Sequence, residues 1–467
     1  MKTKFILLSI SFLLSISAFP ARAFDASKGS GEQIVKTGLN LGPLPAIAYD
    51  ADKGFQYGAI LQLFNYGDGS SYPNYKSKWY LEASFFTKGS SLYNIMYDNM
   101  EMFPGIRMSA MLKTTIDKAM DFYGFNGYES FYDFEKIQSG NDGSSFLYTP
   151  YYKIDRTMVQ FKTDFIGKVT DHFKWELGYH ATYIKLGSIN RASINKGKAE
   201  SQMFPDDALT LYEQYRQWGL ISDAEANGGL ISALRFGLQY DSRDKEGAPT
   251  RGIWADAHLI AAPRFLGTKN PFSKYSLTWR QYFPLIDQDV LTLAYRLNYQ
   301  GIVGRNAPFY ALPFMTVLGE NSDRDAFGGY GTVRGILRDR VVGLDTFCYT
   351  AELRWRFVKF QLWRQNISFG LSAFSDGAMV TRGRNMFYNA TVSGDNFETI
   401  MEHYDYKSQG QKERLHATFG SGLRFIMNEN FIVAFEYGMP LSHLMKNSKI
   451  YNQDGNGAFY INLGYIF

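Results

Sequence analysis

The sequence is poor in cysteine and has no paired histidines, and each shortage excludes a class of site. One cysteine, Cys348, stands among 467 residues, so neither an intrachain disulfide nor a multi-cysteine metal site can form. The six histidines are scattered, and none has a partner at metal-ligand spacing. We therefore expect no metal, no cofactor, no catalytic residues and no enzyme activity.

Net charge and long apolar runs are also lacking. Lysine and arginine number 49 against 45 aspartates and glutamates. Three of the basic residues lie in the first 23 positions, which leaves 46 against 45 in the remainder. A chain so close to neutral gives no support to a nucleic-acid partner. After residue 23, no apolar run approaches the roughly 20 residues of a transmembrane helix.

Residues 1–23 predict a secretory signal peptide. Lys2 and Lys4 precede an apolar core over residues 5–16, and Ala21-Arg22-Ala23 has the small-x-small form of a cleavage site. We expect cleavage near Ala23, export, and a short periplasmic segment over residues 24–40. An uncleaved membrane anchor is the alternative, but the apolar run is short and no basic stop follows it.

Aromatic residues, in contrast, are abundant. They make up 17% of the chain, with 33 tyrosines and 38 phenylalanines, yet the mean hydropathy is −0.26. A transmembrane β-barrel combines these properties because lipid-facing apolar residues alternate with polar residues that face the lumen. A secreted soluble β-sandwich is the competing interpretation.

Period-two alternation favours the barrel. From Leu291 to Tyr299 the odd positions are leucine or tyrosine, and the even positions from Thr292 to Gln300 are mostly polar. Such runs reach the roughly ten residues that a tilted membrane-crossing strand needs, whereas sandwich strands are usually about half as long. The sequence thus predicts an all-β fold, a transmembrane antiparallel β-barrel over residues 41–467.

About sixteen strands are expected, an even number that suits a closed barrel without free edges. The first half comprises residues 41–50, 54–66, 77–88, 91–102, 105–115, 151–168, 172–187 and 229–241. The second half comprises residues 252–265, 273–286, 289–303, 345–360, 366–381, 414–428, 431–441 and 457–467.

Loop length predicts the orientation of this barrel. Short links at 103–105, 170–171, 287–288 and 428–430 are expected to be periplasmic turns, and long links at 116–150, 188–228, 304–344 and 382–413 to be extracellular. A helix near Pro205–Trp218, capped by Asp206 or Asp207, is expected to form a lid over the barrel mouth, with a binding role as the alternative.

Several short motifs follow one another in the second half of the chain. They are Tyr240–Gly252, Leu312–Phe314, Phe327–Gly335 with its Val-Arg-Gly end, Ala351–Arg354, Phe374–Ala378, Gly420–Leu423 and Phe435–Pro440. In this order they resemble the BamA/TamA superfamily of outer-membrane assembly and translocation proteins, also called the bacterial surface antigen family. The resemblance covers most of residues 229–467 and, more faintly, 40–66.

The resemblance implies that the long loop before residue 345 folds into the lumen and is anchored there by Val333, Arg334 and Gly335. Alternation independently places Glu352, Phe374 and Asp376 on lumen faces. We therefore predict that Arg334 pairs with Asp376 and Glu352 while Phe374 covers it. The chain departs from the family pattern at Ala378, where the family has glycine.

The last strand, 458–467, ends the sequence on an aromatic residue. Phe459, Tyr465 and Phe467 share one face with aliphatic residues, and the strand resembles the terminal insertion signal of bacterial outer-membrane barrels. The expected location is the bacterial outer membrane, with outer-membrane lipid as a partner.

The resemblance implies a function in outer-membrane protein insertion, assembly or translocation. It also suggests a member without periplasmic POTRA domains. We expect periplasmic or outer-membrane partner proteins to replace these domains. A passive diffusion channel and a structural subunit of an envelope complex remain alternatives. Inward-facing arginines and acids predict a salt-bridged, plugged lumen, with an anion-selective pore as the sharper alternative. These residues are Arg235, Arg280, Arg296, Arg354, Arg356, Arg424, Glu82, Glu176 and Glu436.

Overall fold

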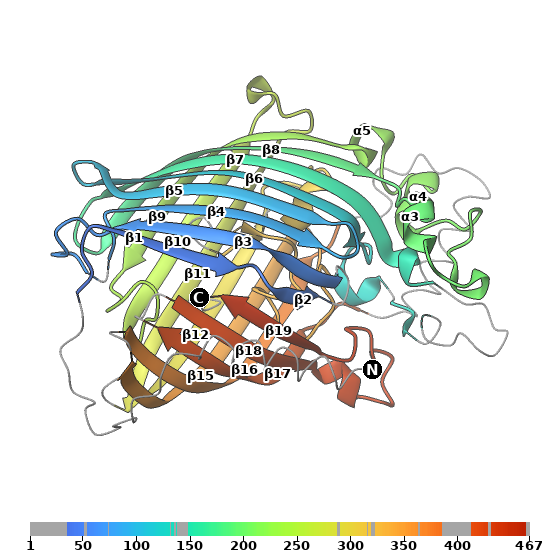
Figure 1. The fold of residues 1–467 in the computed structure, drawn as a ribbon. Coiled ribbons are helices and arrows are strands. Elements are labelled where there is room, and N and C mark those ends of the chain that lie inside the picture. The colour runs from blue at the N-terminus through green and yellow to red at the C-terminus, as the bar shows by residue number, and fades with distance from the viewer. Residues whose placement is uncertain are drawn as a thin grey trace.

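The computed structural model shows one long antiparallel sheet curled into a barrel, with short helices gathered at one end (Figure 1). Within the residues it describes, sixteen strands cross the barrel wall, as the sequence predicted. The structure describes residues 35–50, 54–72, 74–130, 132–134, 137, 148–286, 290–314, 316–318, 323–362, 365–384, 412–427 and 431–463.

The first crossing consists of two short strands, β1 (Leu39–Pro45) and β2 (Ala48–Asp50). Both pair with β3 (Gly54–Asn65), so that Pro45 lies opposite Ala59 and Ala48 opposite Gln56. The interruption follows Pro45, which has no N–H to donate to the ladder.

Each later strand pairs with the next strand of the wall along the chain. The first half continues with β4 (Ser77–Phe86), β5 (Ser91–Phe103), β6 (Ile106–Asp121), β7 (Lys153–Lys168), β8 (Phe173–Gly187), β9 (Gly228–Asp241) and β10 (Gly252–Ala262). The second half comprises β11 (Phe272–Ile286), β12 (Leu291–Ile302), β15 (Asp345–Leu362), β16 (Gln365–Arg382), β17 (His416–Met427), β18 (Phe431–Pro440) and β19 (Ala458–Leu463). The last strand, β19, lies beside β2, so the two ends of the sheet meet (Figure 1).

The side chains of β12 follow the predicted alternation. Ala294 and Arg296 are fully buried inside the wall, whereas Leu297 and Tyr299 expose 42% and 36% of their surface on the outside. An outer face of apolar residues and an inner face of polar ones is the arrangement that a lipid-embedded barrel requires.

The strand β6 is longer than the sequence suggested, since it extends to Asp121 instead of residue 115. The added part carries Asp117 and Asp121, which made it resemble a polar loop. In the barrel these acids face the basic residues of β7: Asp121 accepts a hydrogen bond from Lys153 (2.6 Å), and Asp117 lies 3.8 Å from Arg156. Cross-strand charge pairs therefore continue the ladder.

The long loops close one end of the barrel. Their short helices are α3 (Arg191–Asn195), α4 (Leu211–Gln217), α5 (Asp223–Ala226) and α6 (Ala311–Phe314), with 3-10 turns at Gly127–Glu129, Thr149–Tyr152, Glu200–Gln202, Arg264–Leu266 and Leu441–Leu444. Aromatic residues from three loops, among them Tyr123, Phe125, Tyr212, Tyr215 and Phe309, pack in one buried cluster. None of the helices in the described ranges has the length and apolar character to cross a bilayer.

The helix expected near Pro205–Trp218 is α4, but its predicted cap is wrong. The helix begins after Thr210, not after Asp206 or Asp207. Thr210 Oγ1 accepts a hydrogen bond from the N–H of Glu213 (3.2 Å), and Glu213 accepts one from the N–H of Thr210 (2.8 Å). This reciprocal capping box satisfies two N–H groups at once, which a single aspartate does not.

Two sequence predictions concern residues that lie wholly or partly outside the described ranges. Residues 1–23, the predicted signal peptide, lie outside the described residues, as do Tyr465 and Phe467. Phe459, the remaining member of the predicted C-terminal signal, lies on β19 with 57% of its surface exposed.

Candidate functional site

The loop between β12 and β15 folds into the barrel. A two-stranded sheet of β13 (Thr316–Val317) and β14 (Asp323–Arg324) begins its inner part. The backbone of Val317 donates to Gln300 (2.9 Å) and accepts from Ser276 (3.0 Å) and Asn298 (3.1 Å) on β11 and β12. The loop therefore uses the polar lumen face of the wall as its hydrogen-bonding partner.

Arg334 lies in this loop and is fully buried. Its Nε and Nη2 donate to the two oxygens of Asp376 on β16, at 2.7 and 2.9 Å, and its backbone N–H donates to the same carboxylate at 3.0 Å. Its Nη1 donates to Glu352 on β15 (3.0 Å) and Glu436 on β18 (2.7 Å). A planar guanidinium can serve three carboxylates in this way, whereas a lysine cannot match the bidentate geometry.

The ion-pair cluster around Arg334 contains equal numbers of acids and arginines. Three buried acids, Glu352, Asp376 and Glu436, face Arg334 and two further arginines of the wall. Arg354 donates to Glu352 (2.9 Å), and Arg424 contacts both Glu352 (2.9 Å) and Glu436 (2.7 Å). Burial alone would lower the pKa of Arg334, but Asp376 and Glu352 outweigh it and raise the pKa above its usual value.

The loop also comes very close to the wall at this point. The guanidinium carbon of Arg334 lies 3.4 Å from the ring centre of Phe374. Gly335 has φ +98°, and a Cβ there would stand 2.5 Å from the backbone of Gly438 on β18. Its N–H donates to the hydroxyl of Tyr460 on β19 (3.0 Å). Only glycine allows both this backbone conformation and this approach.

The structure brings together Arg334, Glu352, Phe374 and Asp376, the residues singled out from the sequence. Val333 is fully buried beside them in an apolar cluster that includes Ala378, so alanine fits where the family has glycine. Sequence reasoning missed Glu436 as a partner of Arg334. Alternation does put Glu436 on a lumen face, but only the register of β15, β16 and β18 shows that it reaches the same guanidinium.

A second anchor lies on the opposite side of the barrel and was also missed. Arg338 donates to Asp117 on β6 (2.7 Å) and lies 3.5 Å from Asp121. From β7, Arg156 donates to Asp325 of the loop (2.8 Å). The loop thus joins strands of the first and second halves of the wall, which explains why its arginines are spaced through residues 334–340.

Arg340 connects the same loop to the loops that close one end of the barrel. It donates to three backbone carbonyls, those of Gln453 (2.9 Å), Gly127 (2.8 Å) and Ser130 (2.8 Å). These carbonyls belong to two other loops, so one side chain holds three loops in a fixed arrangement. No local sequence pattern marks such a residue, because its partners are backbone atoms.

Further pairs of opposite charge lie in the barrel. Arg235 lies 3.0 Å from Glu176, and Arg280 donates to Asp256 at 2.6 Å. The buried His416 contacts Asp454 at 2.5 Å. Among the described residues, no group of three or more histidines, cysteines or acids could hold a metal ion. These contacts describe a packed lumen in which charges neutralise each other.

The domain model that matches the chain is the Omp85 superfamily domain, over residues 126–467. The chain belongs to the Omp85 superfamily. This Omp85 chain is accordingly a barrel of the bacterial outer membrane, of the type concerned with protein insertion and translocation. The matched region includes the inserted loop, Arg334 and its three carboxylates.

A solved structure agrees on the fold. The BamA structure from Haemophilus ducreyi that lacks POTRA domains 1–3 is 16% identical, with a TM-score of 0.50, and the match covers 92% of this chain and 70% of that one. CdiB from Escherichia coli is 11% identical, with a TM-score of 0.49 and coverage of 92% and 63%. No curated protein sequence matches the chain.

Proposed function

We propose that this Omp85 barrel inserts or assembles outer-membrane proteins, or translocates proteins across the outer membrane, and that Arg334 holds its inserted loop in the conformation this work requires. The observation that carries the proposal is the loop itself, buried in the lumen and clamped by Asp376, Glu352 and Glu436. Family membership supports the same conclusion.

The packed lumen argues against a passive diffusion channel. An open pore needs a water-filled path, whereas here the loop arginines contact both halves of the wall and the arginines Arg235 and Arg280 are neutralised by nearby acids. In planar bilayers we expect the purified protein to stay mostly closed. A large, stable conductance in every insertion would favour the channel instead.

We further propose that the barrel works with periplasmic or outer-membrane partner proteins that deliver its substrate, and that residues 1–23 direct its export and are removed near Ala23. Copurification in mild detergent tests the first statement, since it should recover partners in fixed stoichiometry. N-terminal sequencing of the protein isolated from outer membranes tests the second, with Phe24 as the expected first residue.

The function is tested by depletion with rescue. Depletion of the chain should reduce a defined set of outer-membrane or surface proteins, measured by quantitative proteomics of the outer membrane. The wild-type protein should restore them, Arg334→Glu should not, and Arg334→Glu with Asp376→Arg should restore them in part. An unchanged outer-membrane proteome after depletion would count against the proposal.

A further inference from the structure

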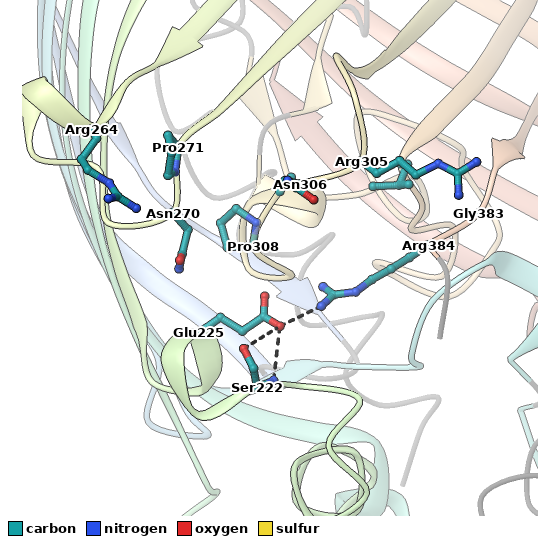
Figure 2. Close-up of a pocket in the computed structure, with 12 residues that line it drawn as sticks. Ser222, Glu225, Arg264, Asn270, Pro271, Arg305, Asn306, Pro308, Gly383 and Arg384 are labelled. Carbon is teal, nitrogen blue, oxygen red and sulfur yellow. Dashed lines mark hydrogen bonds and ion pairs between the residues drawn. The ribbon is translucent and has the colours of Figure 1, made fainter. Parts of the chain in front are cut away.

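The extracellular end of the barrel contains a pocket of about 490 Å³ between loops that follow β8, β10, β12 and β16. Figure 2 shows Arg264 and Asn270 on one side of it and Arg384 with Glu225 on the other. This volume lies within the range of small-ligand sites. Two ends of the inserted loop, at Arg305 and at Leu344, contribute to the pocket, but the carboxylates that anchor Arg334 are not among its lining residues.

The walls of the pocket carry more positive than negative charge. Arg264, Arg305 and Arg384 line it, and Glu225 is the acid among its lining residues, which leaves a net charge of +2. Arg264 and Arg305 have no ion pair within the described part of the chain and lie exposed to solvent. Unneutralised guanidinium groups around one cavity attract an anion.

The carboxylate of Glu225 already accepts hydrogen bonds at both of its oxygens. Glu225 accepts hydrogen bonds from Arg384 (2.7 Å), from the N–H of Phe309 (2.7 Å) and from both the N–H and the hydroxyl of Ser222 (3.3 Å each). It therefore fixes Arg384 in position and has little capacity left to neutralise a second arginine.

Arg384 is the decisive residue. Its side chain is only 9% exposed, and its backbone is clamped to Asn126 by two hydrogen bonds of 2.7 and 2.9 Å. While Nη2 donates to Glu225, the buried Nη1 has no hydrogen-bond partner among the residues that the structure describes. The side chain of Asn270, which lies beside the hydroxyl of Tyr310, also lines the pocket. A buried donor without a partner is costly, and a ligand oxygen would satisfy it.

We propose that this pocket, defined by Arg264, Asn270, Arg305 and Arg384, binds a phosphate group. A phosphate monoester carries about −1.5 to −2 charges at pH 7, which matches the net charge of the walls. Its oxygens suit guanidinium forks and an amide donor. The source of this phosphate group is either a lipid headgroup or a soluble phosphate compound.

The test uses the full-length protein in phosphate-free detergent micelles and two probes, inorganic phosphate and lysophosphatidic acid, titrated by phosphorus NMR. Saturable binding is expected, and it should weaken as salt screens the arginines. The Arg264→Gln/Arg305→Gln double variant and the Arg384→Gln variant should each lose about tenfold or more in affinity, the effect of a lost charge-assisted hydrogen bond. Arg414→Gln, an exposed arginine outside the pocket, is the matched control and should bind as the wild type does.

The two probes distinguish the sources. Tighter binding of lysophosphatidic acid assigns the site to a lipid headgroup, and equal binding of both probes assigns it to the phosphate group alone. Heat-modifiable migration on gels verifies that each variant is folded. The proposal is overturned if neither probe binds saturably to the folded wild type, or if the Arg414→Gln control loses as much affinity as the pocket variants.

Discussion

Replacing Arg334 by methionine is the sharpest test of how the loop is held. Among the described residues, Asp376 Oδ1 accepts a hydrogen bond only from Arg334, and the carboxylate is fully buried. Glu352 keeps Arg354 and Arg424 in the variant, and Glu436 keeps Arg424. The loss therefore falls on Asp376, and the cluster passes from neutral to one negative charge.

An uncompensated buried charge of this kind costs about 3–5 kcal/mol. For an m-value of about 2 kcal/mol/M, the urea midpoint of the folded barrel in lipid vesicles should fall by roughly 2 M. Tryptophan fluorescence measures the transition. Arg414→Met, a change of an exposed arginine, should shift the free energy of unfolding by no more than about 0.5 kcal/mol.

The double variant Arg334→Met/Asp376→Asn decides whether charge is the cause. It restores neutrality, since two glutamates then face two arginines, and it should recover at least about 1.5 kcal/mol relative to the sum of the two single changes. If the double variant loses the full sum, the ion pair does not hold the loop and the reasoning fails.

Three further predictions concern other parts of the inserted loop. Gly335→Ala should destabilise the barrel by more than Gly304→Ala, for which we expect a loss of roughly 1 kcal/mol. Both glycines have positive φ, but of the two only Gly335 has backbone atoms within 3 Å of the position that a Cβ would take. The urea midpoints of the two variants measure this difference. Arg340→Met removes the donor to three carbonyls in two other loops, and each unsatisfied carbonyl costs about 1–3 kcal/mol. Limited proteolysis should therefore cleave these loops while the strands of the barrel stay intact. An unchanged digestion pattern would contradict this expectation. Burial and the nearby Asp325 raise the pKa of Asp339 well above its usual value. Above a pH of about 4, Asp339 therefore keeps its proton in the folded state but loses it in the unfolded state. As a result, the contribution of this side chain to the free energy of unfolding falls as pH rises. Asp339→Asn should be more stable than the wild type at pH 7 and no more stable at pH 4, measured by urea unfolding at both.

Much of the wall could be predicted because its information is local. Side chains of a strand alternate between two faces, so lipid-facing leucines and tyrosines in β12 are visible in a single segment. The same rule placed Glu352, Phe374 and Asp376 in the lumen. It failed at the end of β6, where Asp117 and Asp121 look like loop residues until β7 supplies Arg156 and Lys153.

The predicted cap of α4 was wrong for a related reason. Asp206, Asp207 and Thr210 are all suitable capping residues, and the choice depends on where the aromatic cluster at the barrel mouth places Leu211 and Tyr215. Helix boundaries that tertiary packing determines cannot be found from capping preference alone.

By itself, the sequence determined the all-β architecture, the sixteen strands, the inward faces and the arginine at the centre of the inserted loop, because hydropathy with a period of two and glycine-rich motifs are properties of neighbouring residues. Only the tertiary structure decided the partners. Glu436 lies 102 residues from Arg334, Asp117 lies 221 residues from Arg338, and Arg340 binds carbonyls rather than side chains. Ion pairs form between atoms close in space, and only closing the sheet into a barrel brings these atoms together.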